Sequence, residues 1–311
     1  MVEILLSTYN GDKFLNDFLN SLLTQSYKNW KLIVRDDGSK DKTIDILESF
    51  SQKYPEKVEI IKDSMGNLGP WKSFFHLLKY SKEKYVMFAD QDDIWLPKKI
   101  EITLNKMILS EKKFGENYPI LIHTDLKVVD QNLNNIAESF WQYQNLNPEH
   151  KSLNYLLVQN NVTGCTVMIN ESLKNLINPF PTKAIMHDWW IAIVASAFGT
   201  INYVPESTIL YRQHNNQNTG ARKYSLLSYY KFFIKNPQRV RDSIIKTIEQ
   251  AEEFLKIYND RLNKEQKDML NFYIQLPKLS KKERIKNLIK WKMFKQGKIR
   301  NIGFILNILS L

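Results

Sequence analysis

Cysteine is nearly absent from this chain of 311 residues, which contains Cys165 alone. One cysteine excludes an internal disulfide and is typical of a reducing compartment, so a cytoplasmic location is expected. Long apolar runs are missing too: nowhere do 18 apolar residues follow one another, so no membrane-spanning helix is predicted. The apolar start, Met1–Leu6, has no basic segment and runs into polar residues, so a first strand is expected there and not a signal peptide.

Acidic residues are scarce near the end of the chain. Residues 275–311 contain ten Lys or Arg and one acid, which accounts for +9 of the net charge of +11. The first 274 residues carry only +2, so the main body is not expected to bind nucleic acid. With 43% hydrophobic and 25% charged residues, the composition is that of a globular protein, long enough for one catalytic domain and a smaller appendage.

Strand and helix patterns alternate through the first third of the chain. Apolar residues at helical spacing follow each of the first four strand-like runs, and Pro97 is expected to open the fourth helix. Four such units with short connections predict an α/β fold, a doubly wound, mostly parallel sheet flanked by helices. A later helix is expected at 185–198, and helices dominate from residue 224 onward. The predicted strands are 3–8, 31–35, 58–61, 85–89, 120–130, 164–169, 201–204 and 207–211.

The stretch Tyr85–Trp95, YVMFADQDDIW, joins a buried strand to three carboxylates within four positions: Asp90, Asp92 and Asp93. Carboxylates this close repel one another, so a cation is expected to neutralise them, most simply a divalent metal. A solvated acidic turn is the alternative. The turn follows the carboxyl end of a strand and precedes a helix, which is where open α/β sheets bind their ligands.

Five motifs occur in order along the chain: LLSTYNG, IVRDDGSKD, FADQDDIWLPKKI, MHDWW and LYRQHNNQ. Together they resemble the inverting nucleotide-sugar glycosyltransferases of family 2, which have the glycosyltransferase A-type fold, over about residues 3–217. Within that family the motifs are most similar to the bacterial rhamnosyltransferase-like members that build surface polysaccharides. The resemblance implies a catalytic, nucleotide-sugar-binding domain at 1–220 and a helical, basic C-terminal extension at 221–311.

The resemblance also implies a metal site. Asp92 is expected to be the main ligand of Mn²⁺ or Mg²⁺, and His214 is a further ligand unless it is simply a solvated loop residue. A metal there would stabilise the departing diphosphate as a Lewis acid. Asp93 either takes part or caps the following helix.

A nucleotide pocket is implied at the turns that follow the first strands. Tyr9 can lie flat against a pyrimidine, and Asp37 can accept a hydrogen bond from its ring N–H, which suits dTDP and UDP donors alike. For Tyr9 the alternative is plain packing, and for Asn67 it is an ordinary turn. The residues expected to bind the nucleotide are Thr8, Tyr9, Asn10, Asp37, Asn67, Asp90 and Gln91.

Inversion at a sugar carbon needs one base to take the proton of the acceptor hydroxyl. The resemblance assigns this role to Asp188, with a helix cap as the alternative, and makes His187 its neighbour. Asn215 and Asn216 are expected to order a loop over the donor. The residues expected in the acceptor or sugar pocket are Asn161, Thr163, Gly164, Trp189, Trp190 and Arg212.

The basic C-terminal residues interleave with aromatic and aliphatic ones. Three readings stay open: they bind an anionic membrane surface, pack on the catalytic domain, or form a homodimer contact. The expected activity is transfer of a sugar, L-rhamnose from dTDP-L-rhamnose, to a lipid-linked or oligosaccharide acceptor at the inner face of the cell membrane. The alternatives are a UDP-hexose or UDP-N-acetylhexosamine donor, nucleotidyltransfer on a sugar phosphate, or carbohydrate binding without catalysis. Nucleotidyltransfer is disfavoured, because the first turn lacks a Gly-rich phosphate loop.

Overall fold

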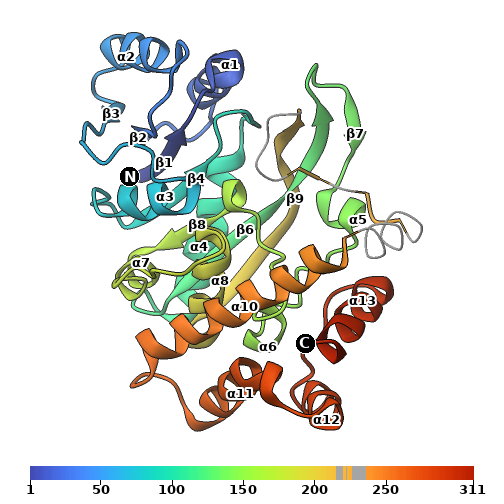
Figure 1. The fold of residues 1–311 in the computed structure, drawn as a ribbon. Helices are drawn as coiled ribbons and strands as arrows, with labels where there is room; N and C mark the ends of the chain where they lie inside the picture. Colours follow the sequence, from blue (N-terminus) through green and yellow to red (C-terminus); the bar gives the residue numbers. More distant parts are fainter. Residues whose placement is uncertain (215–219, 222, 226–235) are drawn as a thin grey trace.

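A computed structural model describes residues 1–214, 220, 221, 223–225 and 236–311 (Figure 1). The strands are β1 (Val2–Thr8), β2 (Trp30–Asp36), β3 (Val58–Ile60), β4 (Tyr85–Ala89), β5 (Ile94–Trp95), β6 (Ile120–Asp130), β7 (Asn135–Ala137), β8 (Met168–Asn170) and β9 (Thr200–Gln213). The helices of the first half are α1 (Asp12–Leu23), α2 (Thr43–Lys53), α3 (Pro70–Leu78), α4 (Lys99–Phe114), α5 (Phe140–Gln144) and α6 (Leu153–Leu156). Later helices are α7 (Glu171–Leu176), α8 (His187–Phe198), α10 (Pro237–Tyr258), α11 (Lys264–Gln275), α12 (Lys281–Trp291) and α13 (Lys298–Leu309).

One mixed sheet forms the centre of the molecule, in the order β3-β2-β1-β4-β8-β6-β9-β5, with β7 paired to β6. The first four strands in this order are parallel, which confirms the predicted strand–helix units. β8 then pairs antiparallel with both β4 and β6, so it is a single reversed strand, and β6 and β9 run in the same direction as β4. The predicted α/β class is confirmed.

Helices cover both faces of the sheet because successive strand residues point to opposite sides. In β1, Ile4 and Leu6 join a core cluster with Phe18 of α1 and Met107 of α4. Leu5 points the other way, into a cluster that α3, α8 and the helices after residue 236 share. The sheet is therefore packed between two apolar core layers, one on each face. The ends of its strands lie outside these layers, where a site can form.

Three local predictions differ from the structure. Pro97 does not open the fourth helix, because Ile94–Trp95 first pairs antiparallel with β9 and α4 begins at Lys99. The expected strand at 164–169 is a 3-10 turn followed by β8. The strands expected at 201–204 and 207–211 form one long strand. The residues between them stay in this strand, and its pairing with β6 shifts register there.

The helices after residue 236 pack below the sheet and are not a detached tail (Figure 1). Trp190 of α8 meets Phe254 of α10 with ring centroids 5.7 Å apart, and Phe304 of α13 belongs to the same buried cluster. Of the helices that the structure describes, none has both the length and the apolarity to span a bilayer.

Candidate active site

Three parallel strands end side by side at one edge of the sheet. Thr8 of β1 lies opposite Asp36 of β2, and Leu6 lies opposite Ala89 of β4. The three turns that follow these strands therefore meet, as expected for the ligand-binding edge of an open α/β sheet.

Hydrogen bonds join the first turn to the acidic turn. The side-chain amide of Gln91 accepts a hydrogen bond from the N–H of Tyr9 and donates one to its C=O, both at 2.9 Å. Gly11 permits this approach, because a Cβ there would lie 2.2 Å from Gln91 Oε1. Thr8 is buried and donates to Asp36 at 2.9 Å, whereas Tyr9 stays 49% exposed. Tyr9 is thus the member of this group that is open to a ligand.

Asn10 and Asp36 brace the second turn. Asn10 accepts a hydrogen bond from the N–H of Lys40 at 2.9 Å, and its own N–H donates to Ser39 Oγ at 2.8 Å. Asp36 accepts from the N–H groups of Gly38 and Ser39 at 3.0 and 2.7 Å. The first two turns are therefore rigidly connected.

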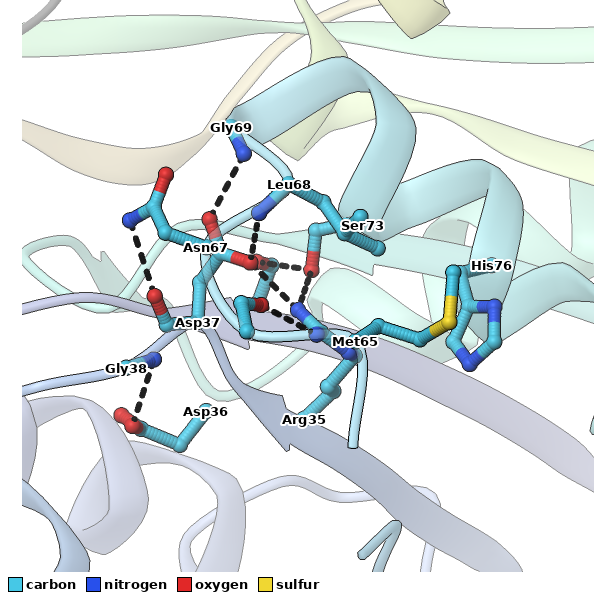
Figure 2. Close-up of polar contacts among 12 residues, drawn as sticks. Arg35, Asp36, Asp37, Gly38, Met65, Asn67, Leu68, Gly69, Ser73 and His76 are labelled. Carbon is cyan, nitrogen blue, oxygen red and sulfur yellow. Dashed lines mark hydrogen bonds and ion pairs between the residues drawn. The ribbon is translucent and has the colours of Figure 1, made fainter. Parts of the chain in front are cut away.

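Asp37 does not have the open carboxylate that the sequence led us to expect. It is 3% exposed, pairs with Arg35, and accepts hydrogen bonds from the N–H groups of Leu68 and Gly69 at 2.7 and 2.8 Å (Figure 2). Asn67, which is exposed, donates to the C=O of Asp37 at 2.8 Å. In this conformation the Asp37 carboxylate holds the loop after β3, so contact with a base requires that loop to move.

Arg35 organises this part of the site, although sequence reasoning missed it. Its guanidinium makes two hydrogen bonds to Asp63, at 2.8 and 3.1 Å, and further ones to the C=O of Gly66 at 2.7 Å and to Ser73 Oγ at 3.2 Å (Figure 2). With the bond to Asp37, every N–H of the guanidinium has a partner. The Arg35 hydrogen bonds lower the pKa of Asp63 to about 2. The available signal was a charged residue that ends an otherwise apolar strand, two positions before Asp37.

The structure brings the two expected metal ligands together. His214 Nε2 lies 2.8 Å from Asp92 Oδ2, although the residues are 122 positions apart. Arg212 supports this contact: its Nε donates to the C=O of Asp92 at 3.0 Å, its Nη2 to Asp17 at 2.8 Å, and its N–H to Asp93 Oδ1 at 3.3 Å. Arg212 is 3% exposed, so the expectation that it lines the sugar pocket is corrected. Its guanidinium braces the acidic turn.

Behind this turn lies a group of buried acidic side chains. Potential ligand atoms of Asp90, Asp93 and Cys165 lie within 4.8 Å of one another. Burial, together with the charges of Asp92 and Asp188, raises the pKa of Asp90 to about 7. Burial and the neighbouring carboxylates raise the pKa of Asp93 well above its usual range, and burial does the same for the Cys165 thiol. A bound cation would therefore favour ionisation of these carboxyl groups.

Lys99 is a second charged residue that sequence reasoning missed. It is fully buried at the start of α4, with Nζ 4.6 Å from the centre of the Trp95 ring and without a hydrogen-bond partner among the described residues. Burial lowers its pKa to about 8, although Cys165 and Asp93 favour its charged form. Lys99 therefore partly balances the acidic group from the core side. The sequence signal was a lysine one turn beyond the aspartates.

Asp188 lies in the first turn of α8, close enough to Asp90 that its charge raises the pKa there. Burial raises the pKa of Asp188 itself to about 6, while the N–H groups of Trp189 and Gly164 oppose the shift. Gly164 allows the close packing, because a Cβ there would lie 2.9 Å from His187 Nε2 and 3.5 Å from the Asp188 Cβ. His187 is buried, and burial lowers its pKa to about 3, so its imidazole is neutral at pH 7 and a much weaker base than an ordinary histidine.

Two residues expected in the acceptor pocket are part of the scaffold. Trp190 is fully buried against Phe254, so in this structure it lies in the core and does not line the expected acceptor or sugar pocket. Asn161 is 3% exposed and donates to the C=O of Asn147 at 2.9 Å, which fixes a loop and corrects its expected ligand contact. Trp189, in contrast, is half-buried and donates to the C=O of Leu156 at 2.6 Å.

The remaining expected residues are either close to Asp188 or outside the described part of the chain. Thr163 is half-buried and precedes Gly164, so it lies beside the start of α8. Asn215 and Asn216 lie outside the described residues.

The donor set at this edge fits a hard divalent cation. The carboxylate of Asp92 and the imidazole of His214 are in contact and offer an oxygen and a nitrogen ligand. Asp93 Oδ2 is buried and has no hydrogen-bond partner among the described residues. Carboxylate oxygens suit Mg²⁺ and Mn²⁺, and an imidazole is tolerated by Mn²⁺. Chemically, the edge can hold a cation and its anionic ligand, and Asp188 can accept a proton near neutral pH.

Comparison with known proteins agrees with this geometry. The Glycosyl transferase family 2 model matches residues 3–177. The chain is 27% identical over 227 residues to dTDP-rhamnosyl transferase RfbG of Shigella flexneri, covering 70% of this chain and 74% of that one. It is 26% identical over 204 residues, 65% of this chain and 73% of the other, to the UDP-Glc:alpha-D-GlcNAc-diphosphoundecaprenol beta-1,3-glucosyltransferase WfgD of Escherichia coli.

A solved structure has the same fold. S. aureus TarS 1–349 in complex with UDP-GlcNAc superposes with a TM-score of 0.59 at 17% identity, covering 93% of this chain and 80% of that one. The fold is therefore the glycosyltransferase A type. Since the family model spans more than half of the residues and includes the acidic turn at 90–93, the chain belongs to glycosyl transferase family 2.

Proposed function

We propose that the protein is a metal-dependent, inverting glycosyltransferase that transfers L-rhamnose from dTDP-L-rhamnose to a carbohydrate acceptor. The observation that supports the mechanism is the contact of His214 with Asp92, next to Asp90, whose pKa is raised by the charges of both Asp92 and Asp188. The similarity to a dTDP-rhamnosyl transferase supports the donor.

Asp188 is the proposed base. Direct displacement at the anomeric carbon needs a proton acceptor on the side opposite the leaving group. With a pKa of about 6, Asp188 is mostly ionised at pH 7 and basic enough to take the hydroxyl proton as the bond forms. Trp189 Nε1 donates a hydrogen bond to the C=O of Leu156, which fixes the position of the indole ring next to Asp188 in the sequence.

Asp92 and His214 are the proposed ligands of Mn²⁺ or Mg²⁺, and Arg212 holds their turn in position. A divalent ion bound there supplies Lewis-acid stabilisation of a leaving diphosphate. Tyr9, which is exposed in the first turn, offers an aromatic face to the base, and Asn67 offers an exposed amide on the loop after β3.

A second candidate donor is a UDP-hexose or UDP-N-acetylhexosamine. It is favoured by the likeness to WfgD, whose name specifies UDP-Glc, and by the same pyrimidine-compatible first turn. Carbohydrate binding without transfer is the alternative of another class, and it would not need Asp92 or Asp188.

We further propose that the acceptor is a lipid-linked or oligosaccharide glycan of a surface polysaccharide, met at the cytoplasmic face of the membrane. The support is the diphosphoundecaprenol acceptor in the name of WfgD and the basic C-terminal region of this chain.

The test is a thermal-shift screen of dTDP-rhamnose, UDP-glucose and UDP-N-acetylglucosamine with the full chain, with and without Mn²⁺. A ligand at 100 times its Kd stabilises by about 2.7 kcal/mol, which the screen resolves. Donor turnover is then measured as released nucleotide diphosphate for the wild type, Asp92→Asn and Asp188→Asn, with the exposed Asp45→Asn as matched control. Binding without turnover in the wild type would indicate a carbohydrate-binding protein, and stabilisation by an unrelated ligand alone would overturn the donor.

A further inference from the structure

The C-terminal helix pair α12–α13 has an inner face that is firmly packed on the body. Leu288, Phe304 and Ile308 are buried, and Arg284 Nη1 donates to the C=O of Ile308 at 2.6 Å. Arg300 donates to the C=O of Gln144 in α5 at 2.6 Å. Packing on the catalytic domain, one of the three readings of this region, therefore describes this inner face. It leaves the outer face to be explained.

The outer face exposes large apolar side chains. On α13, Ile302 and Leu306 lie one helical turn apart and are 59% and 62% exposed, with Leu309 half-buried beside them. On α12, Ile289 is 60% exposed. Burial of such side chains against a partner is favourable, so their exposure on two neighbouring helices points to a contact surface.

The charge of residues 275–311 is predominantly positive. Glu283 is the acid of this region, and it is occupied in the capping box of α12 with Ser280. Arg284 and Arg300 are buried, so the exposed charge comes from lysines, and no ion pair involves these lysines in the part of the chain that the structure describes. The exposed lysines of residues 275–311 are Lys278, Lys281, Lys282, Lys286, Lys290, Lys292 and Lys298.

Lysines and apolar side chains alternate on the same helical faces. Lys298 precedes Ile302 by four residues, and Lys286 precedes Ile289 by three, so each pair lies on one side of its helix. We propose that the outer face of α12–α13 docks onto an anionic lipid surface, with the apolar side chains at the acyl boundary and the lysines at the headgroups. A second copy of the chain fits less well, because two such faces would bring like charges together.

The proposal is tested by co-sedimentation of the full chain with vesicles, without any sugar donor. Binding to phosphatidylglycerol–phosphatidylcholine vesicles is expected at low salt, with little binding to pure phosphatidylcholine and a steep loss at high salt. The double variant Ile302→Ser/Leu306→Ser is expected to lower the partition coefficient at least tenfold. The matched control is Leu109→Ser on α4, which is 62% exposed far from α12–α13 in sequence and is expected to bind like the wild type.

A charge variant, Lys282→Glu/Lys286→Glu, is expected to lower binding to anionic vesicles by about tenfold or more. Equal binding to neutral and anionic vesicles, or no effect of either double variant, would overturn the proposal. So would a dimer, detected by light scattering, that Ile302→Ser/Leu306→Ser dissociates, since the occupant would then be a second copy. Because no donor is present, failure here leaves the proposed transfer reaction untouched, and failure of transfer leaves this result standing.

Discussion

Two groups of carboxylates lie at the same sheet edge, and they differ in how their charge is balanced. Around β2, Asp37 and Asp63 are paired with Arg35, whose N–H groups all have partners, and the pKa of Asp63 is lowered to about 2. Around β4, burial and the neighbouring carboxylates raise the pKa of Asp90 to about 7, and they raise the pKa of Asp93 well above its usual range. In the first group each carboxylate is paired with a cation of the chain itself. In the second, one oxygen of the buried Asp93 has no hydrogen-bond partner among the described residues.

The difference indicates which group is structural and which is functional. Paired ions with satisfied hydrogen bonds hold a loop, but they have no remaining attraction for a ligand. Repelling carboxylates store electrostatic energy that a bound cation can release, and perturbed pKa values of this kind gather at functional sites. The second group is therefore the part of the edge that we propose to be reactive.

The largest expected effect comes from Asp92→Asn, which removes the central carboxylate of the reactive group. Loss of Lewis-acid stabilisation costs several kcal/mol, so transfer is expected to fall on the order of 10³-fold or more. The rate of transfer is measured as release of nucleotide diphosphate in the presence of Mn²⁺. Because repulsion is relieved, the melting temperature without metal should not fall, and a lower one would show that Asp92 is a structural residue.

Asp188→Asn comes next. Removing a general base lowers the rate by about 10²–10⁴-fold, and the donor should still bind because the residue is proposed to act on the acceptor side. Steady-state turnover and donor affinity by calorimetry separate the two quantities. If turnover is retained, the proton acceptor is another group.

Arg35→Met tests the paired group. It leaves the buried Asp37, and its neighbour Asp63, without their cation, so the free energy of unfolding is expected to fall by about 3–5 kcal/mol, as measured in urea. Arg35→Lys keeps the charge but not the forked hydrogen bonds, and an intermediate loss is expected. Unchanged stability in both variants would mean that this pairing does not hold the loop.

The smallest expected effect is a pH dependence of opposite sign for the two groups. The folded pKa values of Asp90 and Asp188, about 7 and 6, lie above their ordinary 3.8, so stability is full below about pH 4 and declines as pH rises through 6–7. Asp63 has a folded pKa of about 2, so its contribution is present above pH 3.8 and is lost as pH falls towards 2.

The measurement is the melting temperature of the metal-free protein between pH 4.5 and 7.5. A decline of a few degrees is expected, and Mn²⁺ should reduce it because it stabilises the ionised carboxylates. Asp90→Asn should also flatten the profile. A melting temperature that rises over this range would contradict the assignment of the two groups.

Much of the fold was predictable because local patterns specify it. The run Tyr85–Ala89 is apolar and strand-forming, and the polar turn after it belongs at a strand end, so the acidic edge followed from sequence. Trp189 and Trp190 show the limit: adjacent residues on a helix point about 100° apart, so only one can face the site, and contact with α10 decides which.

The role of Asp37 could not be predicted either. Its partners include Arg35, Leu68 and Gly69, which converge only when the loop after β3 folds back on β2. The sequence motif alone shows no partner for the Asp37 carboxylate, so it was expected to be available to bind a base. In the folded chain the N–H groups of Leu68 and Gly69 already donate hydrogen bonds to it.

The sequence by itself determined the strand–helix units, the acidic turn and the family, because hydrophobic periodicity and short motifs act over neighbouring residues. Only the tertiary structure decided which charges are paired and which repel. His214 reaches Asp92 across 122 positions, and Arg35 reaches Asp63 across 28. Electrostatic energy depends on distance and burial, and the packing of the sheet sets both.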